Sequence, residues 1–533
     1  MADNTSDSDN LPRASIQARR LLDDAKLLLQ NGDFGAAQDV CRELLAEHTE
    51  YVAALSTFGR AYMAEGKYDS ALPCFVRASM LEPDKPSILV PLGEVYSRLH
   101  GDDMAVLTLE RALALGPDKA DAVTAYRLLG GICERGCDYE RAAEWLEKAL
   151  AIDAADGMTA HLLGVCYEET GAYDKAVKAY KQALKCDISP VDRALVQYCI
   201  ARVSASKTGK KFFAGLEKLK VKAGEVGDEA DSAFLAAHVY AARALVLDRS
   251  GKHEEAWQWL QQANAPLNDL YANDHRMSVE TNAASLERAR NWSFSGPVSV
   301  SGLTVVPVSL FILGPSRSGK TTLERLVGEL DGVRHGHESE IVHDSTAQTS
   351  MTADMLALEY PGQLPTALNQ NFLQNYADEV VKRSRGAKLF TNTHPGSILD
   401  LGRIAETVPN ARFVFVDRDV DDTALRIFCT IYQRGTNHYA YHPNNIYEFL
   451  TGYSLLADTW MEVLSGISVR VSFEDMVADP KKTLQQVADL CGLPAPKGKL
   501  SDVGDDRGCS KPYLDLMKQP VSRQHAFSVT PAG

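Results

Sequence analysis

The sequence predicts a two-part fold, an α-solenoid of paired helices followed by an α/β P-loop domain with a central parallel sheet. Three observations indicate this fold. The N-terminal part repeats with a period of mostly 34 residues, the C-terminal part alternates apolar β-branched runs with helical patterns, and a glycine-rich loop joins one such run to the helix after it. We therefore expect a disordered N-terminus, a helical solenoid, a linker, the α/β domain and a disordered tail, over residues 1–16, 17–290, 291–305, 306–525 and 526–533.

The N-terminal repeat is defined by one alanine in each of its copies. These alanines are Ala37, Ala71, Ala105, Ala142 and Ala176, spaced by 34, 34, 37 and 34 residues. A glycine precedes the alanine by twelve residues in the last four copies, at Gly59, Gly93, Gly130 and Gly164. Small residues at fixed positions let two helices approach closely. The pattern resembles the tetratricopeptide repeat, and Gly251 with Ala256 indicates a looser sixth copy.

Two stretches interrupt or end this pattern. Between Pro190 and Glu229 the sequence is helical and basic, which favours a solvated helix face. After Leu270 the composition shifts to Gly, Pro, Ser and Val, which predicts a linker and then a strand near residues 295–306. Beyond that point the runs VSLFIL and ARFVFVD alternate with helical segments, as in a parallel sheet covered by helices.

Composition excludes several classes of protein. The chain has 56 basic and 71 acidic residues, a net charge of −15, so nucleic-acid binding by broad phosphate neutralisation is not expected. Ten cysteines show no CxxC pair and no zinc-like spacing, which predicts reduced thiols and no metal site. The polar, acidic start and the short apolar stretch Leu303–Leu313 predict a cytoplasmic protein without membrane insertion.

The glycine-rich loop carries the clearest chemical signal. The sequence GPSRSGKTT, Gly314–Thr322, stands between a strand pattern and an amphipathic helix. Backbone N–H groups of such a loop and the helix N-terminus form an anion cradle, to which Arg317 and Lys320 add charge. The loop also fits the general nucleotide P-loop, so an ATP-dependent kinase or NTPase is an alternative, with Thr321 and Asp417 as magnesium ligands.

Four segments carry a resemblance to a known family. GPSRSGKTTLE, VRHGHESEI, the long segment FTNTHPGSILDLGRIAETVPNARFVFVDRDVDDTALR, and VSFEDMVADPKKTLQQVADLCGLP occur in the order found in sulfotransferases that use 3′-phosphoadenosine 5′-phosphosulfate. The chain is most similar to the bacterial group in which tetratricopeptide repeats precede this domain, a group related to tyrosylprotein sulfotransferases. The resemblance implies metal-independent transfer to a glycan or protein acceptor, with the repeats recruiting the acceptor or a protein or peptide partner in their groove.

The resemblance also assigns roles to residues of this chain. It implies that the 5′-phosphosulfate is bound by Ser316, Arg317, Ser318, Gly319, Lys320, Thr321 and Thr322. Arg418 matches the arginine that holds the 3′-phosphate, and Arg426 replaces its usual serine helper with a guanidinium that can form a bidentate contact. Glu338 matches the carboxylate that accepts the acceptor's proton.

Two motifs depart from the family pattern. In the phosphate loop, Ser316 and Lys320 stand where the family usually has a proline and a threonine. Asn392 and Thr393 stand where the family has an Asp-Lys pair, and that lysine stabilises charge on the leaving group. Lys320 or His394 is the candidate replacement, and a non-catalytic adaptor with a degenerate domain is the alternative. A loop at Gln433–Asn445 is expected over the site, with Tyr439, Tyr441 or His442 on the acceptor, unless it is an ordinary surface loop. The segment from Cys509 weakly resembles the family's closing loop near the cofactor.

Overall fold

The chain forms two compact units, unit 1 over Met1–Ser189 and unit 2 over Pro190–Gly533. The computed structural model describes residues 16–99, 101–204, 228–294, 296, 307–360, 362–494, 498, 500 and 503–517. The predicted strand near 295–306, most of the predicted linker, the N-terminus before residue 16, much of the basic segment and the C-terminal tail lie outside these residues. The predicted solenoid crosses the division between the units, so its last helices belong to the same compact unit as the sheet.

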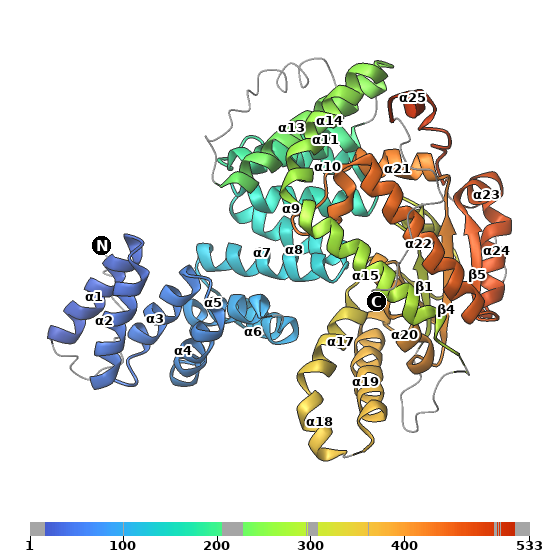
Figure 1. Cartoon of the computed structure of the whole chain (residues 1–533). Helices are drawn as coiled ribbons and strands as arrows, with labels where there is room; N and C mark the ends of the chain where they lie inside the picture. Colours follow the sequence, from blue (N-terminus) through green and yellow to red (C-terminus); the bar gives the residue numbers. More distant parts are fainter. Residues whose placement is uncertain are drawn as a thin grey trace, which may run out of the picture. The chain divides into compact units, whose positions relative to one another are not determined.

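Unit 1 consists of antiparallel helix pairs in its described part (Figure 1). The pairs are α1 Ile16–Gln30 with α2 Phe34–Glu47, α3 Val52–Ala64 with α4 Tyr68–Leu81, α5 Pro86–Arg98 with α6 Asp102–Ala114, α7 Lys119–Arg135 with α8 Tyr139–Ile152, and α9 Gly157–Glu169 with α10 Tyr173–Ala183. All five predicted anchor alanines lie in the second helix of a pair and are fully buried. The helical solenoid predicted from the 34-residue period is confirmed.

Close packing within each pair depends on the repeated glycine. A Cβ atom on that glycine would lie 2.4–2.6 Å from a side-chain atom sixteen residues later, for the pairs Gly59–Phe75, Gly93–Leu109, Gly130–Leu146 and Gly164–Tyr180. All four large partners are fully buried. The glycine therefore provides the space that a large apolar residue of the second helix fills, and this explains why the two positions recur together.

Unit 2 begins with four described helices that precede the sheet. They are α11 Pro190–Val203, α13 Glu229–Arg249, α14 His253–Leu270 and α15 Ala272–Arg290. Gly251, with φ +74°, makes the turn between α13 and α14, where the sequence predicts the sixth repeat. Among the described helices, α13 alone has the length and mean hydropathy, 1.2, of a membrane span. Buried core helices pass the same test, and α13 contributes Phe234 and several alanines to the core shared with α14.

In the described residues, the sheet of unit 2 has five parallel strands in the order β2-β3-β1-β4-β5, as expected for an α/β domain. The strands are β1 Val308–Leu313, β2 Val333–Arg334, β3 Leu389–Asn392, β4 Ala411–Asp417 and β5 Ser468–Ser472. Its helices are α16 Lys320–Val327, α17 Ile341–Met351, α18 Ala353–Glu359, α19 Leu364–Ser384, α20 Leu401–Thr407, α21 Val420–Phe428, α22 Pro443–Val463, α23 Phe473–Ala478, α24 Pro480–Cys491 and α25 Leu514–Met517, with 3₁₀ turns η1 Pro395–Asp400, η2 His438–Tyr441 and η3 Lys511–Tyr513.

Helices cover both faces of this sheet (Figure 1). Leu310 and Ile312 of β1 pack against α16 and α24 on one face. Phe311 and Leu313 pack against α15, α19 and α22 on the other. Successive side chains of a strand point to opposite faces, so the all-apolar run VSLFIL fills two cores and marks β1 as the central strand.

The segment Gln433–Asn445 differs from its prediction. Tyr439 and Tyr441 are 4% and 2% exposed, and the ring of Tyr439 stacks on Phe449 with a centroid distance of 3.6 Å. The turn η2 within it packs against α14, α15 and α22 as part of the core of unit 2, whereas residues 433–436 and His442 are exposed. The expectation that either tyrosine grips an acceptor from a surface loop is wrong, because aromatic packing outweighs a composition rich in Gly, Asn and His.

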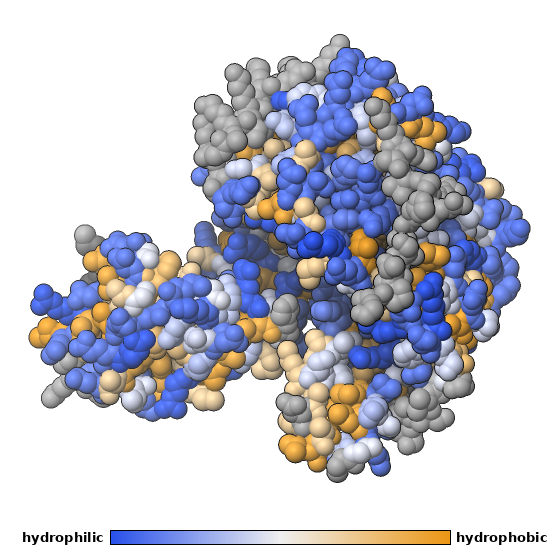
Figure 2. All heavy atoms as spheres, in the orientation of Figure 1, coloured by the Kyte–Doolittle hydropathy of each residue, from blue (hydrophilic) through white to orange (hydrophobic). Residues whose placement is uncertain are grey.

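An exposed apolar patch lies over α17 and α18 (Figure 2). Its largest members are Met351, Met355 and Leu358, each at least two-thirds exposed. The apolar residues of α16, in contrast, are buried against the sheet. Exposed clusters of large apolar side chains are typical of contact regions, so this helix pair is distinct from the helices that only cover the sheet.

Two adjacent glycines of α7 test the packing of the repeats. In Gly130→Ala the new Cβ would lie 2.6 Å from Cγ and Cδ2 of the fully buried Leu146. We expect this overpacking to lower the free energy of unfolding by about 1–2 kcal/mol, measured by urea denaturation followed by far-ultraviolet circular dichroism. Gly131→Ala is the control, because only Arg135 Nη1 at 3.9 Å would be near its Cβ. It should stabilise by about 0.5–1 kcal/mol through helix propensity, and equal effects of the two changes would contradict this account.

Candidate active site

The predicted site segments meet at one edge of the sheet. β1 is flanked by β3 and β4, and all five strands are parallel. The chain runs from β1 to β2 and β3 on one side and then from β3 to β4 on the other side of β1. Open α/β sheets bind ligands in the crevice at such a change of direction, beyond the carboxyl ends of the strands. The loop after β1, the segment after β2, His394 after β3 and Arg418 after β4 all follow strand ends there.

The loop after β1 is shaped by two glycines. Gly319 has φ +102° and immediately precedes α16, and a Cβ there would lie 2.6 Å from the ring of Phe473. A Cβ on Gly314 would lie 2.4 Å from Ser318 Oγ and 2.9 Å from the carbonyl oxygen of Val416. The backbone therefore folds tightly against β4 and turns directly into the helix. Thr321 and Thr322 lie in the first turn of α16, the former exposed and the latter half-buried.

Lys320 is a buried cation at the start of α16. Its side chain is 4% exposed, Nζ makes no hydrogen bond with the described residues, and the nearest carboxylate oxygen, Glu338 Oε1, is 3.8 Å away. Burial lowers the pKa of Lys320, while the charge of Glu338 opposes that change. Ser318 Oγ is also buried without a hydrogen-bond partner. Unsatisfied buried groups are costly, so this pair of donors favours binding of an anion at the loop.

Glu338 lies opposite the loop on a segment held by another carboxylate. Glu324 of α16 is 1% exposed and accepts hydrogen bonds from the backbone N–H of His337, at 2.9 Å, and from the hydroxyl of Thr391. Its second oxygen is 3.2 Å from His337 Nδ1. Burial alone would raise the pKa of Glu324, but the contacts of His337 and Thr391 hold it below the usual value. Glu338 itself is 58% exposed and accessible to a substrate.

The residues at the end of β3 have structural contacts with the same segment. The side-chain amide of Asn392 donates to the carbonyl oxygen of Ser339 at 2.8 Å. The backbone N–H of Thr393 donates to the carbonyl oxygen of His337 at 2.7 Å. His394 Nδ1 accepts from the N–H of Gly396 at 3.2 Å. Burial lowers the pKa of His394, in a neighbourhood that includes Glu338 and Lys320. The three predicted catalytic residues thus lie near one another, and burial favours the neutral imidazole of His394.

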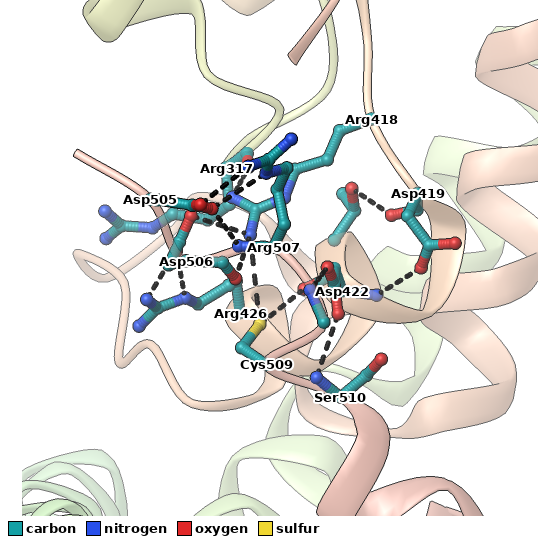
Figure 3. A network of polar contacts seen from close by, with 12 residues as sticks. Arg317, Arg418, Asp419, Asp422, Arg426, Asp505, Asp506, Arg507, Cys509 and Ser510 are labelled. Atoms are coloured by element: carbon teal, nitrogen blue, oxygen red, sulfur yellow. Dashed lines mark hydrogen bonds and ion pairs between the residues drawn. The ribbon is translucent and has the colours of Figure 1, made fainter. Parts of the chain in front are cut away.

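The two predicted phosphate-binding arginines also converge (Figure 3). Arg418 is 5% exposed, lies 4.4 Å from the centroid of the Phe473 ring, and donates to the carbonyl oxygen of Arg317 at 3.3 Å. Both Arg418 and Arg426 bind the carboxylate of Asp506. Asp506 is not predicted by any motif, and the only signal for it is the Asp-Asp pair just before Cys509.

Helices that precede the sheet in the sequence support the phosphate loop indirectly, through the segment that carries Tyr432. The hydroxyl of Tyr432 is 2.8 Å from Ser316 Oγ of the phosphate loop. The segment that carries Tyr432 is held by Tyr198 of α11, whose hydroxyl accepts from the N–H of Ile431 at 3.1 Å, and by Asn264 of α14, which donates to the carbonyl oxygen of Phe428 at 2.9 Å. Neither contact is predicted by the sequence, because each joins positions more than 160 residues apart.

Two observations bear on metal binding. Among the residues that the structure describes, one group of three has ligand atoms within 4.8 Å of one another: Glu324, His335 and His337. Glu324 is already hydrogen-bonded in that group, so its geometry is explained without an ion. Asp417, the magnesium ligand of the alternative NTPase reading, is paired with Arg470 of β5 at 3.0 Å. The expected absence of a metal remains a prediction.

Models of known protein families match parts of both units. Residues 307–497 match a model of the sulfotransferase family. Residues 28–89, 84–155 and 159–187 match models of the tetratricopeptide repeat. The matched sulfotransferase region contains the phosphate loop, Glu338, His394 and both arginines.

Relatives match parts of the chain. Human tetratricopeptide repeat protein 13 is 27% identical over 173 residues, 32% of this chain and 20% of its own length. Lipopolysaccharide assembly protein B of Escherichia coli K12 is 24% identical over 204 residues, 37% of this chain and 50% of its own. The chain therefore spans half or less of these two relatives. A solved structure of MamA is 25% identical with a TM-score of 0.28, covering 30% of this chain and 92% of that one. Separate family models match the repeats and the C-terminal region. The chain is therefore a tetratricopeptide-repeat protein that carries a sulfotransferase-family domain at its C-terminal side.

Proposed function

We propose that unit 2 transfers a sulfuryl group from 3′-phosphoadenosine 5′-phosphosulfate to a hydroxyl of a glycan or protein acceptor. The observation that carries this proposal is the buried pair of donors in the phosphate loop, Lys320 Nζ and Ser318 Oγ, which have no hydrogen-bond partner among the described residues. If the loop served only for packing, it would not keep the side chain of Lys320 at 4% exposure. The sulfotransferase match favours a donor with a sulfated phosphate over ATP.

The donor supplies a sulfuryl group that is already activated by its anhydride bond to phosphate. The loop N–H groups, Arg317 and Lys320 bind and orient its charged end, with Ser316, Ser318, Gly319, Thr321 and Thr322 completing the loop. Arg418 and Arg426 hold the second phosphate, because their guanidinium groups point at one position, now taken by Asp506 (Figure 3). No residue of this set requires a metal ion to act, since positioned cations already face the anion.

Glu338 accepts the proton of the acceptor hydroxyl at its carboxylate. It is exposed to the acceptor, and Lys320 Nζ lies 3.8 Å from its Oε1. Lys320 also stabilises the negative charge that develops on the leaving phosphate oxygen. His394 accepts from Gly396 through Nδ1, so its Nε2–H is the donor available to the site. General-base and charge stabilisation of this kind contribute most when the groups are held in place, as Glu324 holds the Glu338 segment.

The repeats of unit 1 present surfaces suited to protein–protein interaction. We propose that they recruit the acceptor or a protein or peptide partner. The structure of YrrB, described as a tetratricopeptide-repeat protein with an unusual peptide-binding site, is 19% identical with a TM-score of 0.27, covering 32% of this chain and 85% of that one. A cytoplasmic location, with no nucleic-acid or membrane partner, belongs to the same proposal and rests on composition.

One observation favours a second candidate, a non-catalytic adaptor. Asn392 and Thr393 bind the backbone of the Glu338 segment and bring no cation to the site. In that case the domain would bind the nucleotide without turnover. The kinase or NTPase reading is less well supported, because the Asp417 carboxylate is engaged by Arg470.

Lys320→Met tests the phosphate loop. We expect about 10- to 100-fold weaker binding of adenosine 3′,5′-bisphosphate, measured by calorimetry without magnesium, because one charge-assisted contact is lost. Since the change also removes a buried cation, the free energy of unfolding should at least equal that of the wild type. Arg325→Met, a helix substitution outside the loop, is the control. Metal-dependent binding of ATP in place of the bisphosphate would favour the NTPase.

Affinity should also depend on pH. The anion binds the charged form of Lys320, and burial lowers the pKa of that lysine in the free protein. Raising the pH through the lowered pKa neutralises Lys320, so binding of the bisphosphate weakens at a lower pH than a lysine of ordinary pKa would require. In Lys320→Met this slope should disappear, and a slope of equal size in the variant would assign the titration to another group.

Glu338→Gln separates binding from turnover. We expect bisphosphate affinity within about twofold of the wild type but a transfer rate about 10²- to 10⁴-fold lower, because the base is lost while the loop is intact. The assay follows labelled sulfate from 3′-phosphoadenosine 5′-phosphosulfate to a panel of hydroxyl-bearing peptides and oligosaccharides. Glu340→Gln is the control. A wild-type protein that binds the bisphosphate but transfers to no acceptor would support the adaptor.

A further inference from the structure

A carboxylate of the chain itself occupies the position between the two phosphate-binding arginines (Figure 3). Asp506 Oδ1 is 3.0 Å from Arg418 Nη2. Asp506 Oδ2 accepts from Arg426 Nε at 2.9 Å and from Arg426 Nη2 at 2.5 Å. One carboxylate thus uses both of its oxygens on two guanidinium groups, in the manner in which a phosphate oxygen set would.

The backbone on the C-terminal side of Asp506 is firmly attached. Asp422, near the start of α21, accepts from the N–H of Gly508 at 2.5 Å and from that of Ser510 at 2.9 Å. Burial would raise the pKa of Asp422, but these hydrogen bonds hold it below its usual value. Tyr513 then packs in the core of unit 2 and donates to Asp248 at 2.6 Å. Asp506 is therefore held close to the arginines at a high local concentration.

The neighbouring acid does not share this contact. Asp505 pairs with Arg507, at 2.9 Å to Nε and 2.7 Å to Nη2, and is half exposed. The chain therefore offers two adjacent aspartates of equal charge, of which one binds the arginine pair and the other binds a solvent-exposed arginine. This difference provides a matched control.

Asp506 and a phosphate would compete for the same donors. Arg426 gives Nε and Nη2 to one oxygen of Asp506, so that edge of the guanidinium is fully used. A phosphate can take the edge only when the carboxylate leaves, and the departing carboxylate returns to water at the partly exposed site. A phosphate dianion has more charge and a third oxygen, so it can displace the carboxylate. Its binding free energy is then reduced by the free energy of the internal ion pair that is broken.

We propose that Asp506 is an internal competitor for the second phosphate of the nucleotide, which keeps the arginine pair in place when the site is free and weakens retention of the bisphosphate product. This proposal rests on the proposed function, because it takes the arginine pair as the site of that phosphate. Asp506 is in this sense an affinity-determining residue, and it acts on the substrate through Arg418 and Arg426 without contacting the sulfuryl group.

The test compares Asp506→Asn with Asp505→Asn in the full chain. Calorimetry measures binding of adenosine 3′,5′-bisphosphate and of adenosine 5′-phosphate, which lacks the second phosphate. We expect Asp506→Asn to bind the bisphosphate about tenfold more tightly, with the gain shrinking at high salt, and to bind the monophosphate as the wild type does. Asp505→Asn should leave both affinities within about twofold. Asp506→Ala, with folding checked by circular dichroism, should show the same gain.

The other outcomes overturn the proposal in distinguishable ways. Weaker bisphosphate binding in Asp506→Asn would show that the carboxylate only organises the arginines. Equal binding in wild type and variant, or an equal gain in Asp505→Asn, would remove the competitor role and leave the proposed function intact. If neither wild type nor variant binds the bisphosphate, the proposed function fails and this proposal fails with it.

Discussion

The buried carboxylate of Glu324 is the interaction on which the geometry of the site depends. It lies one helical turn after Lys320, and it binds the backbone of His337 and the hydroxyl of Thr391. Each of these residues is next to a group of the site, since Glu338 follows His337 and Asn392 follows Thr391. One side chain therefore fixes the phosphate-loop helix, the segment of the proposed base and the end of β3 relative to one another. Removing a partner would leave a buried carboxylate with fewer of its hydrogen bonds, which is costly, so these contacts hold the three elements together.

A second constraint is the positive charge collected at the carboxyl edge of the sheet. Lys320 and Arg418 are nearly fully buried, although the chain as a whole has a net charge of −15. Buried cations destabilise a fold unless an anion compensates them. Arg418 has such an anion in Asp506, whereas Lys320 has only a carboxylate oxygen at 3.8 Å. The edge is thus partly neutralised by the chain itself and partly left for a ligand.

The sequence predicts well what depends on local spacing. The repeated glycines define the helix pairs because each recurs against a large apolar side chain sixteen residues later in the same repeat. The phosphate loop is predicted because its strand, glycines and helix are contiguous. Asp506 and the contacts of Tyr198 and Asn264 are not predicted, since their partners lie 80 to 233 residues distant and are brought close only by the sheet and its helices. The expectation that Tyr439 grips an acceptor is wrong for a related reason, because its ring packs on Phe449 of α22.

Two departures from the family pattern have one physical explanation under the proposed function. The family has its cation at the end of β3 and a threonine in the loop, whereas this chain has Asn392 and Thr393 at the first place and Lys320 at the second. Both places are at the same edge of the sheet, because β1 and β3 are parallel neighbours. Asn392 and Thr393 bind the backbone of the base segment, and Lys320 brings its ammonium group to 3.8 Å from Glu338. The ends of β1 and β3 are adjacent, so under the proposed function Lys320 after β1 lies beside the same reacting atoms as the family's lysine after β3. The absence of a lysine after β3 therefore does not by itself remove the cation that the chemistry requires.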